Sequence, residues 1–173
     1  SLSDAAQKFE YPVPKSLAGN LQPLIECAAY SAFGAIATLS KARKWKVCHI
    51  LLIGITDISS KLYELLQDHG YDVRLSNPNP DARIPQDLLV PWAEAVCYRC
   101  DILVPCTDNF PSLGPGLAKK LRCHSIVSVA DNILPTSRDE REETHVAMAD
   151  NGIFDFGDGL CDLGQIAKFY HES

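Results

Sequence analysis

The chain has little positive charge and no long apolar run. Of its 173 residues, 16 are Lys or Arg and 22 are Asp or Glu, and the formal net charge is -6. The one basic cluster, Lys41–Lys46, reads as a solvated linker, so nucleic acid is not an expected partner. The longest apolar run, Ile50–Ile55, is far below the roughly 20 residues that cross a bilayer, and no leader pattern opens the chain. We therefore expect a cytoplasmic protein that does not bind membranes.

A disulfide framework is also missing. The count of seven Cys is odd, and most of them, among them Cys48 and Cys106, lie inside apolar stretches, as buried reduced thiols do. Cys97 and Cys100 have the spacing of half a metal or redox motif. Zinc would need a second pair of ligands, and the nearest candidates, Cys123-His124, are adjacent. A redox pair would precede a helix, whereas this one leads into a predicted strand. We therefore predict structural thiols and no metal site.

What is present is the composition of one globular domain, with 46% hydrophobic and 22% charged residues. Strand-like apolar runs alternate with helical patterns, which predicts βαβ units and a parallel sheet with helices on both faces. Strands are expected over residues 47–54, 71–76, 100–106, 125–130 and 153–156, long helices over 24–42, 59–70, 136–151 and 163–170, and short helices or turns within 81–95 and 113–121. The predicted fold is α/β, a single doubly wound Rossmann-like domain over residues 24–173 with a mostly parallel sheet, after an arm over residues 1–23.

The turn after the first predicted strand carries part of a dinucleotide-binding signature, G-x-G-x-x-G. There the first glycine permits the turn, the second lets the backbone approach a pyrophosphate, and the third lets helix and strand pack closely. Gly54 holds the first position, Thr56 the second and Ser59 the third. Thr56 and the neighbouring Asp57 oppose an anion at the helix start, while Ser59 is small enough for packing and could cap the helix. Two interpretations of this turn are equally favoured: it binds pyrophosphate, or it no longer binds it tightly.

Further polar residues follow the later strands. Asn77 stands where a ribose-binding acid is expected, and before Pro78 it is also explained as a turn residue. Ligands of open α/β sheets collect outside the carboxyl ends of the strands, where Cys106–Asn109 and Ala130–Asn132 should line a crevice. The candidate contacts for NAD or NADP are Gly54, Ile55, Thr56, Asp57, Ile58, Asn77, Cys106, Thr107, Asp131 and Asn132.

The run Cys100-Asp-Ile-Leu-Val-Pro-Cys106 resembles the Cys-Asp-Ile-(aliphatic or Phe)-x-Pro-Cys-Ala strand of the Glu/Leu/Phe/Val amino-acid dehydrogenase family. Weaker similarities to that family fall at residues 28–32, 121–132, 135–136 and 151–164. The resemblance covers roughly residues 24–165 and implies the NAD(P)-binding domain of an oxidoreductase. The chain departs from the family at Ala28, where a Thr would contact the cofactor amide, and at Asp131, where an Asn is usual. The family's catalytic Lys and Asp lie in a separate amino-terminal domain, for which residues 1–23 are too short.

These departures leave three functions open. The chain could be a degenerate nucleotide-binding domain that acts with a separate catalytic partner, with a homo-oligomer also possible. It could be a non-catalytic module that binds a protein partner or another small ligand. Least favoured is a small complete enzyme acting through Cys106, Asp108 and Asp131. No catalytic residue is assigned from the sequence.

Overall fold

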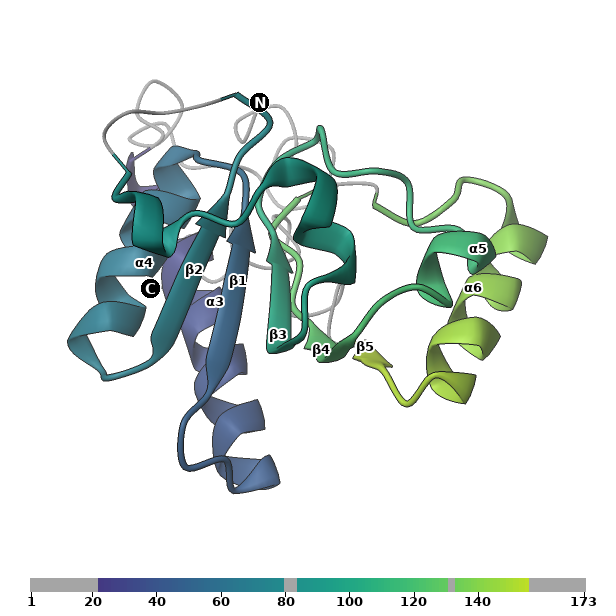
Figure 1. The fold of residues 1–173 in the computed structure, drawn as a ribbon, viewed down its shortest axis with the longest axis horizontal. Helices are drawn as coiled ribbons and strands as arrows, with labels where there is room; N and C mark the ends of the chain where they lie inside the picture. Colours follow the sequence, from purple (N-terminus) through teal and green to yellow (C-terminus); the bar gives the residue numbers. More distant parts are fainter. Residues whose placement is uncertain (1–21, 80–83, 131–132, 156–173) are drawn as a thin grey trace.

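The computed structural model describes residues 22–79, 84–130 and 133–155 (Figure 1). In these residues five strands form one sheet in the order β2-β1-β3-β4-β5, and every neighbouring pair is parallel. The strands are β1 (His49–Ile53), β2 (Asp72–Ser76), β3 (Cys100–Pro105), β4 (Cys123–Ile126) and β5 (Phe154–Asp155). The helices are α3 (Gln22–Arg43), α4 (Asp57–Asp68), η1 (Gln86–Leu88), η2 (Trp92–Cys97), α5 (Pro115–Ala118) and α6 (Arg138–Asp150). The predicted doubly wound α/β fold is confirmed.

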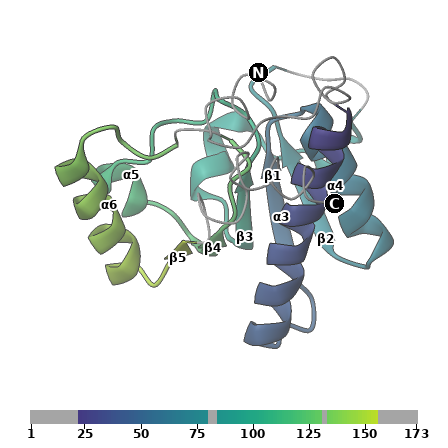
Figure 2. The same ribbon diagram turned by 180° about the vertical axis from the view of Figure 1, so that it is seen from behind.

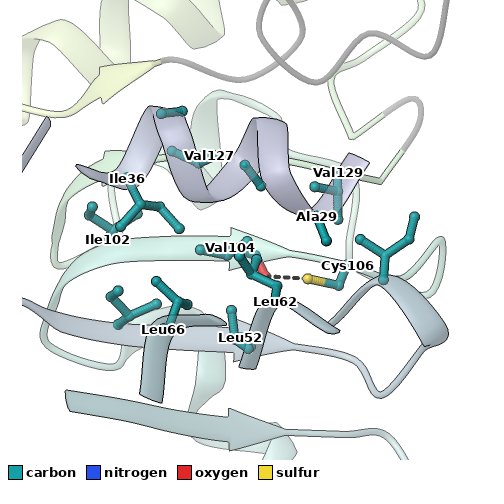
Figure 3. Packing of buried hydrophobic residues seen from close by; sticks show 14 of the residues in the cluster. Ala29, Ile36, Leu52, Leu62, Leu66, Ile102, Val104, Cys106, Val127 and Val129 are labelled. Atoms are coloured by element: carbon teal, nitrogen blue, oxygen red, sulfur yellow. Dashed lines mark hydrogen bonds between the residues drawn. The ribbon is translucent and has the colours of Figure 1, made fainter. Parts of the chain in front are cut away.

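Side chains of β1, which lies between β2 and β3, alternate between two hydrophobic cores. Ile50 and Leu52 pack in the core that α3 and α4 cover, while Leu51 and Ile53 pack in the core on the other face, beneath η2, α5 and α6 (Figures 1 and 2). Figure 3 shows Leu52 in the first core, beside side chains of α3 and α4. Burial on both faces explains why β1 is a continuous apolar run in the sequence.

Small side chains let α3 pack closely against α4. Ala28, Ala29, Ala32 and Ala35 are all buried on its inner face. Among the described residues, α3 is the helix whose length and composition would also suit a membrane span, but half of its most apolar window is buried inside the protein. Such burial is the pattern of a core helix.

The structure shifts several predicted boundaries. The fourth strand was expected over residues 125–130 but runs over Cys123–Ile126. The amides of Val127 and Val129 still donate hydrogen bonds to the β3 carbonyls of Leu103 and Pro105. The Ala130 amide donates both to the Ser128 hydroxyl and to the Pro105 carbonyl, each over 3.2 Å, so the regular ladder ends here. The predicted helix over 163–170 and residues 1–21 of the predicted arm lie outside the described residues.

Candidate functional site

Gly54 shapes the turn after β1 through its backbone. Its φ of +98° lies in the region that favours glycine, and a Cβ added there would meet the Cβ of Thr107 at 2.5 Å. Its amide donates to the Ser76 carbonyl over 2.7 Å, which keeps the chain tied to the end of β2 as it leaves β1. The turn therefore needs glycine for two independent reasons, backbone conformation and the close approach of Thr107.

A reciprocal capping box opens α4. Thr56 is the N-cap residue, with an extended backbone (φ -134°, ψ 173°), and its hydroxyl accepts a hydrogen bond from the Ser59 amide at 3.2 Å. The Thr56 amide donates in turn to the Ser59 hydroxyl at 2.8 Å. The Ser59 hydroxyl therefore takes part in the cap, as predicted. It does so as the third residue of α4, which begins two residues earlier than expected and has Thr56 at its N-cap. The small size of Ser59 also matters, since this residue is 1% exposed.

Two backbone amides remain at the start of α4. The Ser59 amide is capped, and the Ser60 amide donates to the Thr56 carbonyl at 2.9 Å. Among the described residues, no acceptor bonds to the amides of Asp57 and Ile58. Such amides and the positive end of the helix dipole together attract anions. The exposed carboxylate of Asp57 lies in the same turn and would compete with an incoming anion.

Asn77 ties the loop after β2 to the turn after β1. Its Oδ1 accepts a hydrogen bond from the Ile55 amide at 3.0 Å, and its Nδ2 donates to the Asn79 carbonyl at 2.7 Å. Both ends of the side-chain amide are thus engaged within the protein. This geometry favours the turn interpretation of Asn77, and a ribose hydroxyl would have to share or displace one of these bonds.

The residues after β3 divide between core and crevice. Cys106 is buried in the core beneath α3 and α4, and its thiol donates to the Val104 carbonyl at 3.3 Å (Figure 3). Its side chain therefore faces the core, and its amide donates to the Ile53 carbonyl at 2.8 Å. Thr107 is half-buried against Gly54, and its hydroxyl accepts from the Asn109 amide at 3.2 Å. Asp108 is exposed, while Asp131 and Asn132 lie outside the described residues.

The cysteines of the described residues are free thiols. Burial raises the pKa of Cys48 and of Cys123 to about 12, with the Asp101 carboxylate adding to the effect at Cys48. Burial also raises the pKa of Cys100 strongly. Cys97 is exposed, so the two ends of the Cys-x-x-Cys pair lie in different surroundings. No group of three or more His, Cys, Asp or Glu in the described part of the chain is arranged to hold a metal ion.

The sequence did not reveal two features of this region. One is the contact between Thr107 and Gly54, which joins residues far apart in the chain and leaves no local pattern. The other is a cavity of about 390 Å³ between α4 and residues 84–88. The cavity joins α4 to a segment beyond β2, so no local sequence pattern marks it.

No protein-family model and no curated protein matches this chain. Solved structures do match it. The L-tryptophan dehydrogenase of Nostoc punctiforme has a TM-score of 0.70 and 18% identity, over 86% of this chain and 47% of that one. The hetero-hexameric glutamate dehydrogenase of Thermus thermophilus has a TM-score of 0.61 and 15% identity, over 84% of this chain and 39% of that one. An NAD+-bound 3-phosphoglycerate dehydrogenase of Entamoeba histolytica has a TM-score of 0.55 and 18% identity, over 79% of this chain and 47% of that one.

At these low identities the likeness shows the fold, which is the Rossmann-type α/β fold found in dehydrogenases. The chain spans less than half the length of each of these three proteins. Their activities are properties of longer proteins, of which this chain matches one part.

Proposed function

We propose that this chain is a dinucleotide-binding domain, functionally related to that of amino-acid dehydrogenases, which takes NAD or NADP at the carboxyl end of β1. The observation that carries the proposal is the turn itself. Gly54 adopts φ +98° at the end of a buried central strand, and α4 follows with the Asp57 and Ile58 amides lacking an acceptor among the described residues. The sheet order β2-β1-β3 puts this turn at a topological switch point, where such folds bind ligands.

The pyrophosphate would bind the amides of Asp57 and Ile58, beside Thr56 and Ile55. Asn77 would lie at the adenosine ribose. Thr107, the main chain of Cys106, and Asp131 and Asn132 would face the other half of the cofactor. Because the Asp57 carboxylate repels a pyrophosphate, we expect weak binding. An oxidoreductase reaction would require an acid, a base and a substrate pocket from a catalytic partner or a further domain.

The charge of Asp57 gives the sharpest test. Asp57→Asn removes the repulsion, and calorimetric titration with NAD at low salt should show affinity rising about two- to five-fold, since charges in a first helical turn are worth about 0.3–1 kcal/mol. Asp68→Asn is the matched control, because Asp68 is the exposed last residue of the same helix. Equal affinities for both variants and the parent chain would contradict a pyrophosphate at this turn.

A second function rests on the capping box. Thr56 and Ser59 satisfy each other's hydrogen bonds, so the turn is stable without a ligand. This favours a non-catalytic module that binds a protein partner or another small ligand. Millimolar NAD or NADP should raise the melting temperature if the domain binds either cofactor. No rise with either one would leave the module as the better account.

A further inference from the structure

In its described part, the connection that leaves β2 contains short 3-10 turns in place of the longer helix that usually follows a strand in this kind of fold. β2 ends at Ser76, and Leu89 already forms a parallel bridge with Leu75 along the outer edge of β2. Between β2 and this bridge, the only regular element among the described residues is the single turn of η1. Along the flank of α4 above β2, the described helical element from this connection is therefore η1.

A cavity of about 390 Å³ lies at that flank. Its walls are mainly aliphatic, and its volume is within the range of sites for small organic ligands. The described lining residues are Ile55, Ser59, Ser60, Tyr63, Glu64, Leu75, Ile84, Pro85 and Leu88. The cavity reaches the turn after β1 only at Ile55 and Ser59, so most of it lies away from the proposed dinucleotide site.

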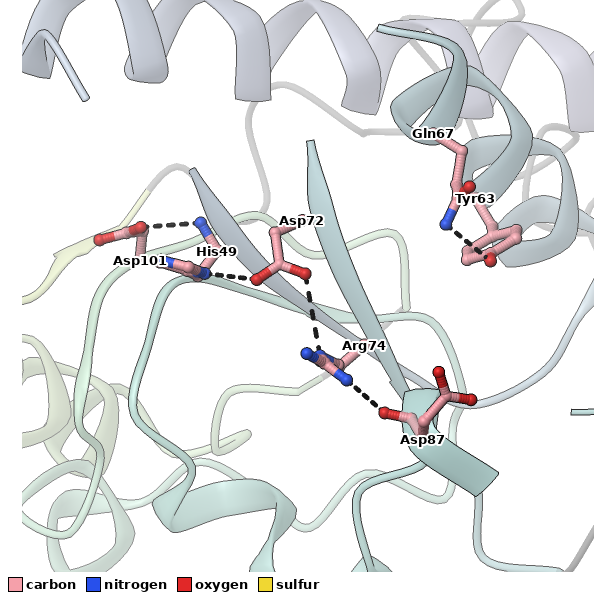
Figure 4. A network of polar contacts seen from close by, with 7 residues as sticks. All are labelled: His49, Tyr63, Gln67, Asp72, Arg74, Asp87 and Asp101. Carbon is pink, nitrogen blue, oxygen red and sulfur yellow. Dashed lines mark hydrogen bonds and ion pairs between the residues drawn. The ribbon is translucent and has the colours of Figure 1, made fainter. Parts of the chain in front are cut away.

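The polar groups of the cavity come from α4. The Tyr63 hydroxyl oxygen accepts a hydrogen bond from Nε2 of Gln67 at 2.8 Å, one turn further along the helix (Figure 4). Glu64 carries the only formal charge among the described lining residues. Its carboxylate is 4.0 Å from the Lys61 ammonium, and its side chain is 69% exposed, so this ion pair is weak. An apolar chamber with a carboxylate and a tyrosine beside it suits an amine carried on an apolar group.

We propose that this cavity binds a small aromatic amine, with the ring between Leu75, Ile84 and Leu88 and the ammonium group at Glu64. The site adjoins the proposed dinucleotide site at Ile55 and does not depend on it. The space lies between α4 and residues 84–88, and the Glu64 carboxylate selects the charge of the ligand.

Phenethylamine is a suitable probe, and phenylacetate is its oppositely charged counterpart. In a methyl-resolved NMR titration of the full chain, millimolar phenethylamine should shift the methyl resonances of Ile55, Leu75 and Leu88 in a saturable way. Phenylacetate should bind more weakly, and Glu64→Gln should cut the affinity for phenethylamine by about two- to five-fold, the worth of an exposed ion pair. Equal binding of the two probes, or shifts centred elsewhere, would overturn the proposal.

A substitution that fills the cavity provides the second test of the proposal. Ser60 is exposed on α4 and lines the cavity, so Ser60→Phe should fill the space without disturbing the core. It should abolish the phenethylamine shifts, whereas Ser60→Ala should leave them intact. NAD titration of Ser60→Phe separates this site from the dinucleotide site, because NAD affinity should not change. Phenethylamine binding that survives Ser60→Phe in a folded variant would overturn the proposal.

Discussion

The two ends of the sheet are finished in different ways. At the amino end, polar groups are paired with one another. The His49 amide donates to Oδ2 of Asp101 at 2.8 Å, and Nδ1 of His49 lies 2.6 Å from Oδ2 of Asp72 (Figure 4). Oδ1 of Asp72 in turn lies 3.8 Å from Nε of Arg74, and Nη1 of Arg74 donates to the Asp87 carbonyl. Three buried thiols, those of Cys48, Cys100 and Cys123, lie at the same end.

At the carboxyl end, the contacts are made mainly by backbone groups. Gly54 turns the chain, Asn77 holds the Ile55 amide, and the amides of Asp57 and Ile58 have no acceptor among the described residues. The polar groups at the amino end are thus bonded to one another. At the carboxyl end, the two backbone amides of Asp57 and Ile58 remain available as donors. A ligand gains more hydrogen bonds at the carboxyl end, which is why the proposed dinucleotide site is there.

The largest effect on stability should come from a substitution of Gly54, at the carboxyl end of the sheet. Gly54→Ala introduces a Cβ at φ +98° and forces it against Thr107, so we expect the free energy of unfolding to fall by about 3 kcal/mol or more. Gly34→Ala is the matched control, because Gly34 lies within α3 and nothing stands within 4 Å of its added Cβ. It should stabilise by about 0.5–1 kcal/mol. Denaturant unfolding measures both, and similar effects at the two sites would show that the Gly54 turn is not constrained.

At the amino end, high pH should lower the free energy of unfolding, because buried thiols lie there. An unfolded thiol ionises near pH 9.0, whereas burial raises the pKa of Cys48 and Cys123 to about 12 in the folded chain. The unfolded state therefore loses protons first, and the free energy of unfolding should fall as pH rises from 9.0 to about 12. Denaturant midpoints measured over this range in Cys123→Ala should show a shallower decline than in the parent chain. An unchanged slope would mean that this thiol is not shielded.

Cysteine labelling in the native state gives an independent check of the same burial. Exposed Cys97 should react with a thiol reagent at neutral pH much faster than Cys48, Cys100 or Cys123.

Asn77 should give a smaller effect. Asn77→Ala leaves the Ile55 amide without its acceptor, so stability should fall by about 1–2 kcal/mol. Asn79→Ala is the control, since Asn79 takes part through its backbone carbonyl, which the substitution keeps. A loss for Asn79→Ala as large as for Asn77→Ala would argue that the loop itself, and not the bond to Ile55, is what matters.

The fold was largely predictable from the sequence, because its main signals are local. The apolar run of β1, the stripe of α4 and the small residues of α3 each specify an element by composition and spacing alone. Boundaries were less predictable where hydrogen bonds decide them. Thr56 and Ser59 could each cap α4, and only their reciprocal bonding fixes its start. The bond from Ile55 to Asn77 and the contact of Thr107 with Gly54 join separate loops, so no periodic pattern announces them.

The central claim is that the amides at the start of α4 receive the pyrophosphate of NAD or NADP. The most direct measurement is an amide correlation spectrum of the chain titrated with NAD into the millimolar range. The account predicts that the amide resonances of Asp57 and Ile58 shift most, with saturation, and that the Ser59 amide shifts less because Thr56 already caps it. Undisturbed Asp57 and Ile58 resonances at millimolar NAD and NADP would contradict it.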